Sequence, residues 1–365
     1  MQNGISVYAG IGYKIGENLS LIQSAAELGL KRLFTSTHIP ESLKDADNFF
    51  NDFAEIVTAA ATHGFEIILD VNPENISEFD LDGLILRLDD GFNPAQIVEL
   101  SKKRRVQLNA STVTSEFLTK LLNLGADFKN ISALHNFYPQ VHTGLDTYFF
   151  TEQNKLLHDF EIEVGAFVPT LDGKRRPPFG EGLPTVEDCR NFTTDLAARF
   201  MAALGADFII VGDGLPTEDE CKALANVRED EVIMRARLLT DDETSIDILN
   251  NSFTRRPDVS KSVIRAVEGR QFLKNSGGTI EPDGFPVERS FGDVTIANDH
   301  FGRYAGEVQI VDNNLPADSR VNTVAKIIEE EIFLTSYIRP RQKFSLRFIY
   351  TKHPVVETIV AEMMA

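Results

Sequence analysis

The stretch FFNDFAEIVTAAATHGFEIILDV, residues 49–71, decides the fold, because a helix and a strand follow each other in it directly. Its first part repeats apolar residues at helical spacing, and Gly64 stands where a helix commonly ends. Residues 66–71 are mostly Ile, Leu and Val and predict a buried strand. A chain that repeats this unit forms parallel strands joined by helices.

The unit recurs along the first part of the chain. The β-rich runs are residues 5–10, 32–37, 66–71, 84–89, 106–111, 131–137, 163–168 and 208–213. Eight such strands with right-handed crossovers close a (β/α)8 or TIM barrel, which we predict over residues 1–228. An open doubly wound sheet is the alternative, but the glycines of YAGIGYKIGEN lack the spacing of a dinucleotide-binding loop.

A second domain is predicted over residues 229–351. It contains the β-rich runs 231–239, 293–298, 306–311, 320–327 and 343–350, separated by turns. These runs favour a mainly antiparallel β domain, a small barrel, with helical signal largely confined to VSKSVIRAVEG, residues 259–269. Residues 352–365 form a C-terminal tail that we expect to be dispensable.

Charge and composition exclude several classes of partner. Lys and Arg number 36 against 55 Asp and Glu, and the net charge of −19 repels nucleic acid and anionic membranes. No apolar run approaches the length of a membrane span, and the N-terminus lacks the pattern of a signal peptide. With Cys189 and Cys221 as its only cysteines, the chain is expected in the reducing cytoplasm.

Polar residues gather where the predicted barrel strands end, and this is the edge at which barrel enzymes hold their active sites. Alternation along the third and fourth strands turns Asp70, Arg87 and Asp89 toward the barrel axis. The polar residues that end other strands are Asn109 and Ser111, His135 or Asn136 with Tyr138, and Asp213. Their convergence is the strongest functional signal that the residues give by themselves.

Each of these residues also has a purely structural interpretation. Arg87 and Asp89 could be a buried ion pair that fills a barrel layer. Asp70 precedes Asn-Pro and could cap a helix. A single histidine such as His135 is more often a satisfied core residue than a catalytic base, and Asp213 could shape a glycine-rich turn.

An anionic ligand would require arginines in this chain. Barrel phosphate sites use backbone amides of the loop after the eighth strand, and Asp213 argues against an anion there. The candidate arginines are therefore Arg87 and, in the loop LDGKRRPPFGEG, Arg175 with Arg176. Basic residues in a loop are otherwise usually solvated surface.

Metal and nucleophile motifs are weak. No His or Cys residues have zinc-site spacing, and no Gly-x-Ser-x-Gly turn is present, so we predict neither a redox cofactor nor a tightly held metal. Mg²⁺ held by Asp70 and Asp89 stays open. A carboxylate-rich pocket beside an arginine suits acid/base chemistry on a sugar.

Motifs along nearly the whole chain resemble those of the MupG-like 6-phospho-N-acetylmuramidases. They are RLFTSTHIPE, ILDVNP, LRLDDGF, LNAST, HNFYPQVHTGLD, FGEGLPTVEDCR, NDHFGRYAGEVQIV and NNLPADSRVNTVAKIIEEEIFL. The resemblance implies an N-terminal TIM barrel and a small, cyclophilin-like C-terminal β domain. It also implies cleavage of a cytosolic disaccharide, N-acetylmuramic acid 6-phosphate linked to N-acetylglucosamine, in cell-wall recycling.

We therefore expect a glycosidase with Asp70 and Asp89 as its catalytic carboxylates, in an unassigned order. Glu181 and Asp213 are reserve carboxylates, and the acetamido group of the substrate could replace a protein nucleophile. The expected substrate-binding residues are Arg87, Asn109, His135, Asn136, Tyr138, Glu181, Asp213 and Arg303. An aldolase, epimerase or lyase acting on another phosphosugar and a non-catalytic sugar-phosphate sensor are the alternatives, and a homodimer stays open.

Overall fold

The computed structural model describes residues 1–11, 13–37, 46–74, 76, 82–89 and 91–349. The chain divides into two compact units, Met1–Glu229 and Asp230–Ala365. The predicted tail, residues 352–365, lies outside the described residues.

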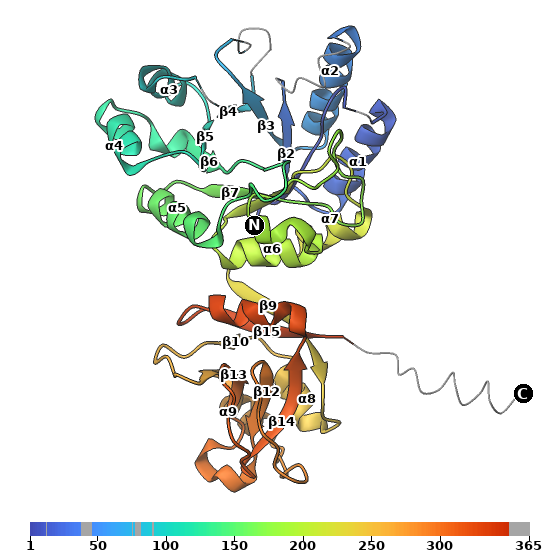
Figure 1. Cartoon of the computed structure of the whole chain (residues 1–365), viewed down its shortest axis with the longest axis vertical. Helices are drawn as coiled ribbons and strands as arrows, with labels where there is room; N and C mark the ends of the chain where they lie inside the picture. Colours follow the sequence, from blue (N-terminus) through green and yellow to red (C-terminus); the bar gives the residue numbers. More distant parts are fainter. Residues whose placement is uncertain (12, 38–45, 75, 77–81, 90, 350–365) are drawn as a thin grey trace, which may run out of the picture. The chain divides into compact units, whose positions relative to one another are not determined.

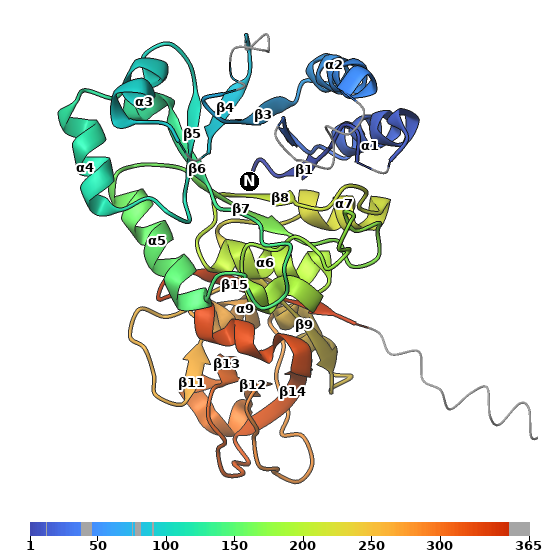
Figure 2. The same ribbon diagram turned by 45° about the horizontal axis from the view of Figure 1, so that its top comes forward.

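The first unit is a closed barrel of parallel strands, each paired with the next along the chain, and β8 pairs with β1 (Figure 1). The strands are β1 Gly4–Ser6, β2 Arg32–Ser36, β3 Glu66–Val71, β4 Ile85–Leu88, β5 Val106–Asn109, β6 Ile131–Leu134, β7 Val164–Val168 and β8 Phe208–Val211. The helices are α1 Ile15–Glu27, α2 Ala46–Thr62, α3 Pro94–Ser101, α4 Ser115–Asn123, α5 Thr147–Asp159, α6 Thr194–Ala203 and α7 Glu218–Ala225. They surround the strands (Figure 2), so the predicted TIM barrel is confirmed.

Local signals set the ends of these helices. Asn93 caps α3, since its side chain accepts the backbone N–H of Gln96 at 3.1 Å and Pro94 takes the first helical position. Gly64 follows α2 with a φ of 76°, a left-handed conformation that glycine adopts without strain. The chain can then turn directly into β3, as the opening stretch predicts.

The barrel interior consists of an apolar layer with a polar layer above it. The buried apolar cluster comprises Tyr8, Ile11, Phe34, Ile68, Ile85, Leu134, Phe167, Phe208 and Ile210. Gly165 makes room for it, because a Cβ at that position would lie 2.1 Å from the ring of Phe208. Two residues further along β2, β3 and β4, the side chains on the same face are Ser36, Asp70 and Arg87. The polar layer thus lies at the carboxyl ends of the strands, where barrel enzymes hold their sites.

The second unit is a seven-stranded sheet of order β10-β15-β9-β14-β12-β13-β11. Its strands are β9 Glu231–Leu238, β10 Phe253–Thr254, β11 Val263–Arg265, β12 Asp293–Ala297, β13 Val308–Val311, β14 Val321–Ile327 and β15 Lys343–Phe348. Its α-helices are α8 Glu243–Leu249 and α9 Gly269–Ser276, and the 3₁₀ segments are η5 Asp299–Tyr304 and η6 Glu329–Tyr337. The β9–β15 pair is parallel and the other ladders are antiparallel, so the mainly antiparallel β domain is confirmed.

This sheet curls until its two end strands meet. Arg255 and Ala266, which follow β10 and β11, form an isolated antiparallel bridge, and Val267 donates its N–H to the carbonyl of Thr254 at 2.9 Å. The predicted helix over residues 259–269 is wrong. β11 lies there instead, because Ile264 pairs with Ile310 of β13 and is buried while its neighbours are not. This alternation is the pattern of a half-buried strand.

Candidate active site

The register of the barrel brings the polar residues of β3 and β4 together. Asp70 lies opposite Arg87 in the β3–β4 ladder, and Arg87 Nη1 is 2.6 Å from Asp70 Oδ1. The second carboxylate oxygen, Oδ2, accepts the hydroxyl of Ser36 on β2 at 3.2 Å. Both side chains are almost fully buried. Both oxygens of the Asp70 carboxylate are therefore engaged, one by Arg87 and the other by Ser36.

Arg87 connects this carboxylate to two further residues. Its Nη1 lies 3.6 Å from Asp89 Oδ1, and its Nη2 donates to Asn136 Oδ1. The oxygens of Asp70 and Asp89 cannot be farther apart than the sum of their distances to Nη1, about 6 Å. Arg87 Nε is buried and has no partner among the described residues. The rim thus holds two carboxylates on one guanidinium, and this upper limit admits the separation of about 5–5.5 Å at which retaining glycosidases hold their carboxyl pair.

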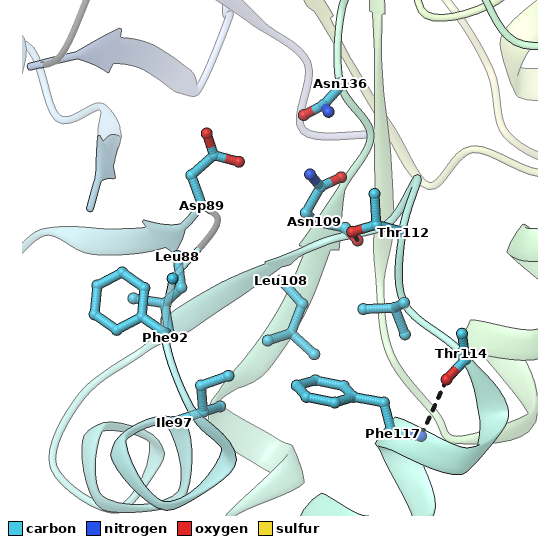
Figure 3. Close-up of a pocket in the computed structure, with 12 residues that line it drawn as sticks. Leu88, Asp89, Phe92, Ile97, Leu108, Asn109, Thr112, Thr114, Phe117 and Asn136 are labelled. Carbon is cyan, nitrogen blue, oxygen red and sulfur yellow. Dashed lines mark hydrogen bonds between the residues drawn. The ribbon is translucent and has the colours of Figure 1, made fainter. Parts of the chain in front are cut away.

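A cavity of about 580 Å³ lies beside this group. Figure 3 shows Asp89, Asn109 and Asn136 near one end and apolar side chains toward the other. The apolar lining residues are Leu88, Phe92, Ile97, Leu108, Val113 and Phe117. The Asp89 side chain is 31% exposed, whereas that of Asp70 is 10% exposed. Asp89 is therefore the carboxylate of this pair that a ligand in the cavity can reach.

His135 does not reach this cavity. It is completely buried, its Nδ1 lies 3.2 Å from Ser111 Oγ, and its Nε2 lies 3.0 Å from Asn154 Oδ1 on α5. Burial lowers the pKa of His135 to about 4, so the imidazole is neutral at pH 7. Because an amide oxygen only accepts, Nε2 carries the proton and Nδ1 accepts the hydroxyl of Ser111. Because its side chain is completely buried, His135 exposes no atom for the substrate contact that the sequence predicts.

The His135 network instead positions Asn136. Ser111 Oγ accepts the backbone N–H of Asn136 at 3.0 Å, and the Asn136 side chain binds Arg87. Asn109 fixes the neighbouring turn, since its Oδ1 accepts the N–H of Ser111 at 3.1 Å. Asn109 and Asn136 therefore line the cavity as the sequence predicts, and His135 stands behind them.

Asp213 organises the loop between β7 and α6. It is fully buried and accepts the backbone N–H groups of Arg176, Thr170 and Leu183 at 2.9, 3.1 and 3.2 Å. Burial raises the pKa of Asp213, and the three hydrogen bonds from backbone N–H groups counteract that effect. The side chain faces the loop backbone, so the expectation of Asp213 as a reserve carboxylate receives no geometric support. Glu181 lies exposed in the same loop.

The two arginines of this loop differ in their partners. Arg175 donates from Nε to the carbonyl of Thr170 at 3.0 Å and from Nη2 to that of Arg190 at 3.1 Å. Arg176 instead lies over two rings at the barrel mouth, 5.0 Å from the ring centre of Tyr8 and 4.8 Å from that of Phe137. Its Nη1 is buried without a partner among the described residues. Arg176 is thus the loop arginine whose bonds do not go to backbone carbonyls.

Arg190 clamps the loop after β6 to the loop after β7, and no motif in the sequence singles it out. Its guanidinium binds the carboxylate of Glu187 at 2.7 Å and donates to the carbonyl of Tyr138 at 3.0 Å. Tyr138 also donates its N–H to the carbonyl of Pro184 at 2.9 Å and is half-buried. These hydrogen bonds hold the Tyr138 backbone in place. The expected contact of its ring with a sugar stays a prediction.

Arg303 belongs to the second unit. It is exposed, its Nη2 lies 2.9 Å from the hydroxyl of Tyr304, and its guanidinium lies 4.9 Å from the centre of that ring. Asn298 at the start of the same segment is structural, because its buried side chain donates to Asn322 Oδ1 at 2.8 Å. The expected role of Arg303 in fixing an anionic substrate stays a prediction.

Metal-ligating side chains do not cluster in the described part of the chain. No group of three or more His, Cys, Asp or Glu residues there is arranged to hold a metal ion. The positive charge within reach of both Asp70 and Asp89 is the guanidinium of Arg87, whose Nη1 lies 2.6 Å from the first carboxylate and 3.6 Å from the second. None of the described helices is long and apolar enough to span a membrane.

Comparison with known sequences matches both units to one enzyme family. The N-terminal profile of 6-phospho-N-acetylmuramidase covers residues 3–226, and the C-terminal profile covers residues 232–347. The chain belongs to the 6-phospho-N-acetylmuramidase family. It is therefore a glycosidase, and the resemblance found in its motifs is confirmed.

Two solved structures are similar to this family member over nearly all of both chains. An uncharacterised protein of B. cereus is 27% identical, with a TM-score of 0.82, and the match covers 95% of this chain and 99% of that one. A conserved Enterococcus faecalis protein of unknown function is 28% identical, with a TM-score of 0.67 and 100% coverage of both chains. No curated protein matches the chain.

Proposed function

We propose that the barrel hydrolyses the β-1,4 bond between N-acetylmuramic acid 6-phosphate and N-acetylglucosamine. The observation that carries this proposal is the pair of carboxylates, Asp70 and Asp89, on the guanidinium of Arg87 beside an open cavity. Most glycosidases use such a pair at the scissile bond. The family profiles support a phosphorylated muramyl substrate.

The exposure of the two carboxylates divides their roles. Asp89 faces the cavity and acts as the acid/base: it donates a proton to the leaving glycosidic oxygen, and water then supplies the hydroxyl at the anomeric carbon. Asp70 is held in place by Arg87 and Ser36, and its carboxylate balances the positive charge that develops on the sugar ring. Participation of the substrate's acetamido group is compatible with one exposed carboxylate.

Arg176 is the proposed contact for the 6-phosphate. Of the three candidate arginines, Arg87 is bound to carboxylates and Arg175 to backbone carbonyls. Arg176 packs on the ring of Phe137, and the preceding residue, Asn136, accepts a hydrogen bond from Arg87. Two adjacent residues therefore connect the proposed phosphate contact with the carboxylate pair. A guanidinium bound to rings retains N–H groups for bidentate phosphate binding.

The apolar part of the cavity suits the less polar faces of the sugars. Leu88, Ile97 and Phe117 offer hydrocarbon surface for pyranose carbons or acyl methyl groups, while Asn109 and Asn136 offer amide groups for hydroxyls. A phosphorylated substrate and two buried free cysteines fit the proposed setting, cell-wall recycling in the cytoplasm.

The test is release of N-acetylglucosamine from the phosphorylated disaccharide by the purified chain and by Asp89→Asn. The wild type should hydrolyse the disaccharide and Asp89→Asn should not, and the two proteins should unfold at the same temperature. Asp219→Asn, a change at an exposed acidic residue on α7, is the matched control and should keep full activity. Absence of product with the wild type, or full activity of Asp89→Asn, would contradict the proposal.

A further inference from the structure

The second unit contains a cavity of its own, of about 440 Å³. Arg265 of β11 and Gln309 of β13 are paired across the sheet and both line it. Their neighbours Ile264 and Ile310 are buried. Since successive side chains of a strand point to opposite faces, the cavity lies on the face opposite to this apolar core. It is therefore a hollow in the polar face of the sheet.

Positive charge is in excess around this cavity, although the chain as a whole carries −19. Arg265 shares Asp258 with Arg256, and Asp318 is bound at 2.8 Å by Arg320. Arg289 is nearly buried, and its Nη2 donates to the carbonyl of Pro316 at 2.8 Å. The lining residues and their direct partners are Arg265, Arg289, Arg303 and Arg320 against Asp258, Glu307 and Asp318, and Arg256 lies one contact farther out, on Asp258. Four guanidinium groups against three carboxylates, with a fifth guanidinium on the shared Asp258, favour an anionic ligand.

Hydrogen-bonding capacity inside the cavity is incompletely used. Glu307 is buried, and its Oε1 accepts the amide of Gln309 at 3.1 Å. Arg265 Nε is buried without a partner in the described residues. Buried polar groups normally find partners, and unmet ones point to water or a ligand. A carboxylate, an amide and guanidinium groups in one hollow are the set that binds sugar hydroxyls.

Two rings form the remaining wall. Phe301 and Tyr304 of η5 meet edge to face with ring centres 5.5 Å apart, and Tyr304 is 37% exposed. Arg320 lies 4.4 Å from the ring centre of Phe301. An exposed aromatic ring beside hydrogen-bonding groups offers a surface for the carbon face of a pyranose.

We propose that this cavity binds an anionic pyranose, a sugar that carries a carboxylate or a phosphate. The site lies wholly within the second unit and does not depend on the chemistry of the barrel. Four residues of the segment NDHFGRYAGEVQIV line it, namely Phe301, Tyr304, Glu307 and Gln309. The carboxylate and phosphate forms share the arginine contact and are separated by experiment.

The test uses calorimetric titration of the full chain with glucuronic acid, glucose 6-phosphate and neutral N-acetylglucosamine. The background variant carries Asp89→Asn and Arg176→Gln, so that barrel binding is weakened. It should bind at least one of the acidic sugars, and the tighter of the two names the anion. Affinity should exceed that for N-acetylglucosamine by at least about tenfold and fall with salt, as a charge-assisted contact requires.

Adding Tyr304→Ala to the background should weaken acidic-sugar binding at least about tenfold. Tyr148→Ala, at an exposed tyrosine of the first unit, is the matched control and should leave it unchanged. Glu307→Gln is a second variant that keeps the shape of the cavity and should alter affinity without altering thermal unfolding. No acidic-sugar binding in the background, equal binding of the neutral sugar, or unchanged binding in both cavity variants would overturn the proposal.

Discussion

Asp70 and Arg87 are register partners on β3 and β4, and their side chains form an ion pair of 2.6 Å at the end of the barrel interior. The ladder itself sets this pairing, because both residues project from the same side of neighbouring strands. Removing one partner of a buried pair leaves an uncompensated charge. The rim carboxylates therefore differ in what they contribute to stability and in what they contribute to chemistry.

Asp70→Asn should lower the free energy of unfolding by roughly 3 kcal/mol, because Arg87 then loses its nearest carboxylate. Asp89→Asn should leave stability nearly unchanged and lower kcat by about 10²–10⁴, because an amide cannot transfer a proton. Urea unfolding and steady-state kinetics on both variants measure the difference. Equal losses of stability in the two variants, or full activity of either one, would show that the division of roles is wrong.

Arg176→Gln should reduce kcat/KM for the phosphorylated disaccharide by about 10- to 100-fold, the value of a charge-assisted hydrogen bond. It should not change kcat/KM for the unphosphorylated disaccharide, which has no group to lose. Arg175→Gln is the control: it should destabilise the loop, whose carbonyls it binds, without distinguishing the two substrates. An equal effect of Arg176→Gln on both substrates would place the phosphate elsewhere.

His135 should make stability depend on pH. Its pKa falls from the ordinary 6.5 to about 4 on folding, so the stabilisation is complete above about pH 6.5 and is lost as the pH falls toward 4. Between pH 7 and pH 4.5 this residue should remove on the order of 2 kcal/mol. The destabilisation caused by His135→Gln should therefore shrink by that amount at pH 4.5.

Urea unfolding at the two pH values measures this, with His63→Gln, at an exposed position, as the control that should keep the wild-type slope. NMR should in addition show one imidazole that stays neutral at pH 5.5. The buried network would be refuted if His135→Gln left the pH dependence of the free energy of unfolding unchanged and all seven histidines titrated near their ordinary pKa.

Prolonged treatment with EDTA should leave turnover of the phosphorylated disaccharide unchanged. The reason is local: Arg87 supplies the positive charge between Asp70 and Asp89 that a divalent cation would otherwise supply. Loss of activity that is restored by Mg²⁺ would move the mechanism to metal-assisted chemistry.

The parts of the site that the sequence predicts are those set by alternation. Asp70 and Arg87 follow Ile68 and Ile85 at an interval of two, so an apolar interior layer places them inside the barrel as well. The same rule predicts that His135 and Asn136 point to opposite sides of the strand. Leu134 faces the barrel interior, so its immediate neighbour His135 must face the surrounding helices.

Contacts between distant loops could not be predicted. The hydrogen bonds that Asp213 accepts from backbone N–H groups depend on how the loop of about 25 residues between β7 and α6 folds back. No local sequence pattern encodes that path. Asn154, which holds His135, comes from a helix whose face is fixed only by packing. The mistaken helix at residues 259–269 has the same origin, since Ile264 is a strand residue through its partner Ile310.

The most direct test of the proposed function is a paired measurement of kcat/KM on the muramyl disaccharide with and without its 6-phosphate, using wild type and Asp89→Asn. The proposed mechanism predicts a preference of wild type for the phosphorylated form of at least about tenfold, since an unfilled arginine site wastes its desolvation. It also predicts loss of turnover of both forms in Asp89→Asn. Equal wild-type kcat/KM for the two disaccharides, or undiminished turnover by Asp89→Asn, would contradict it.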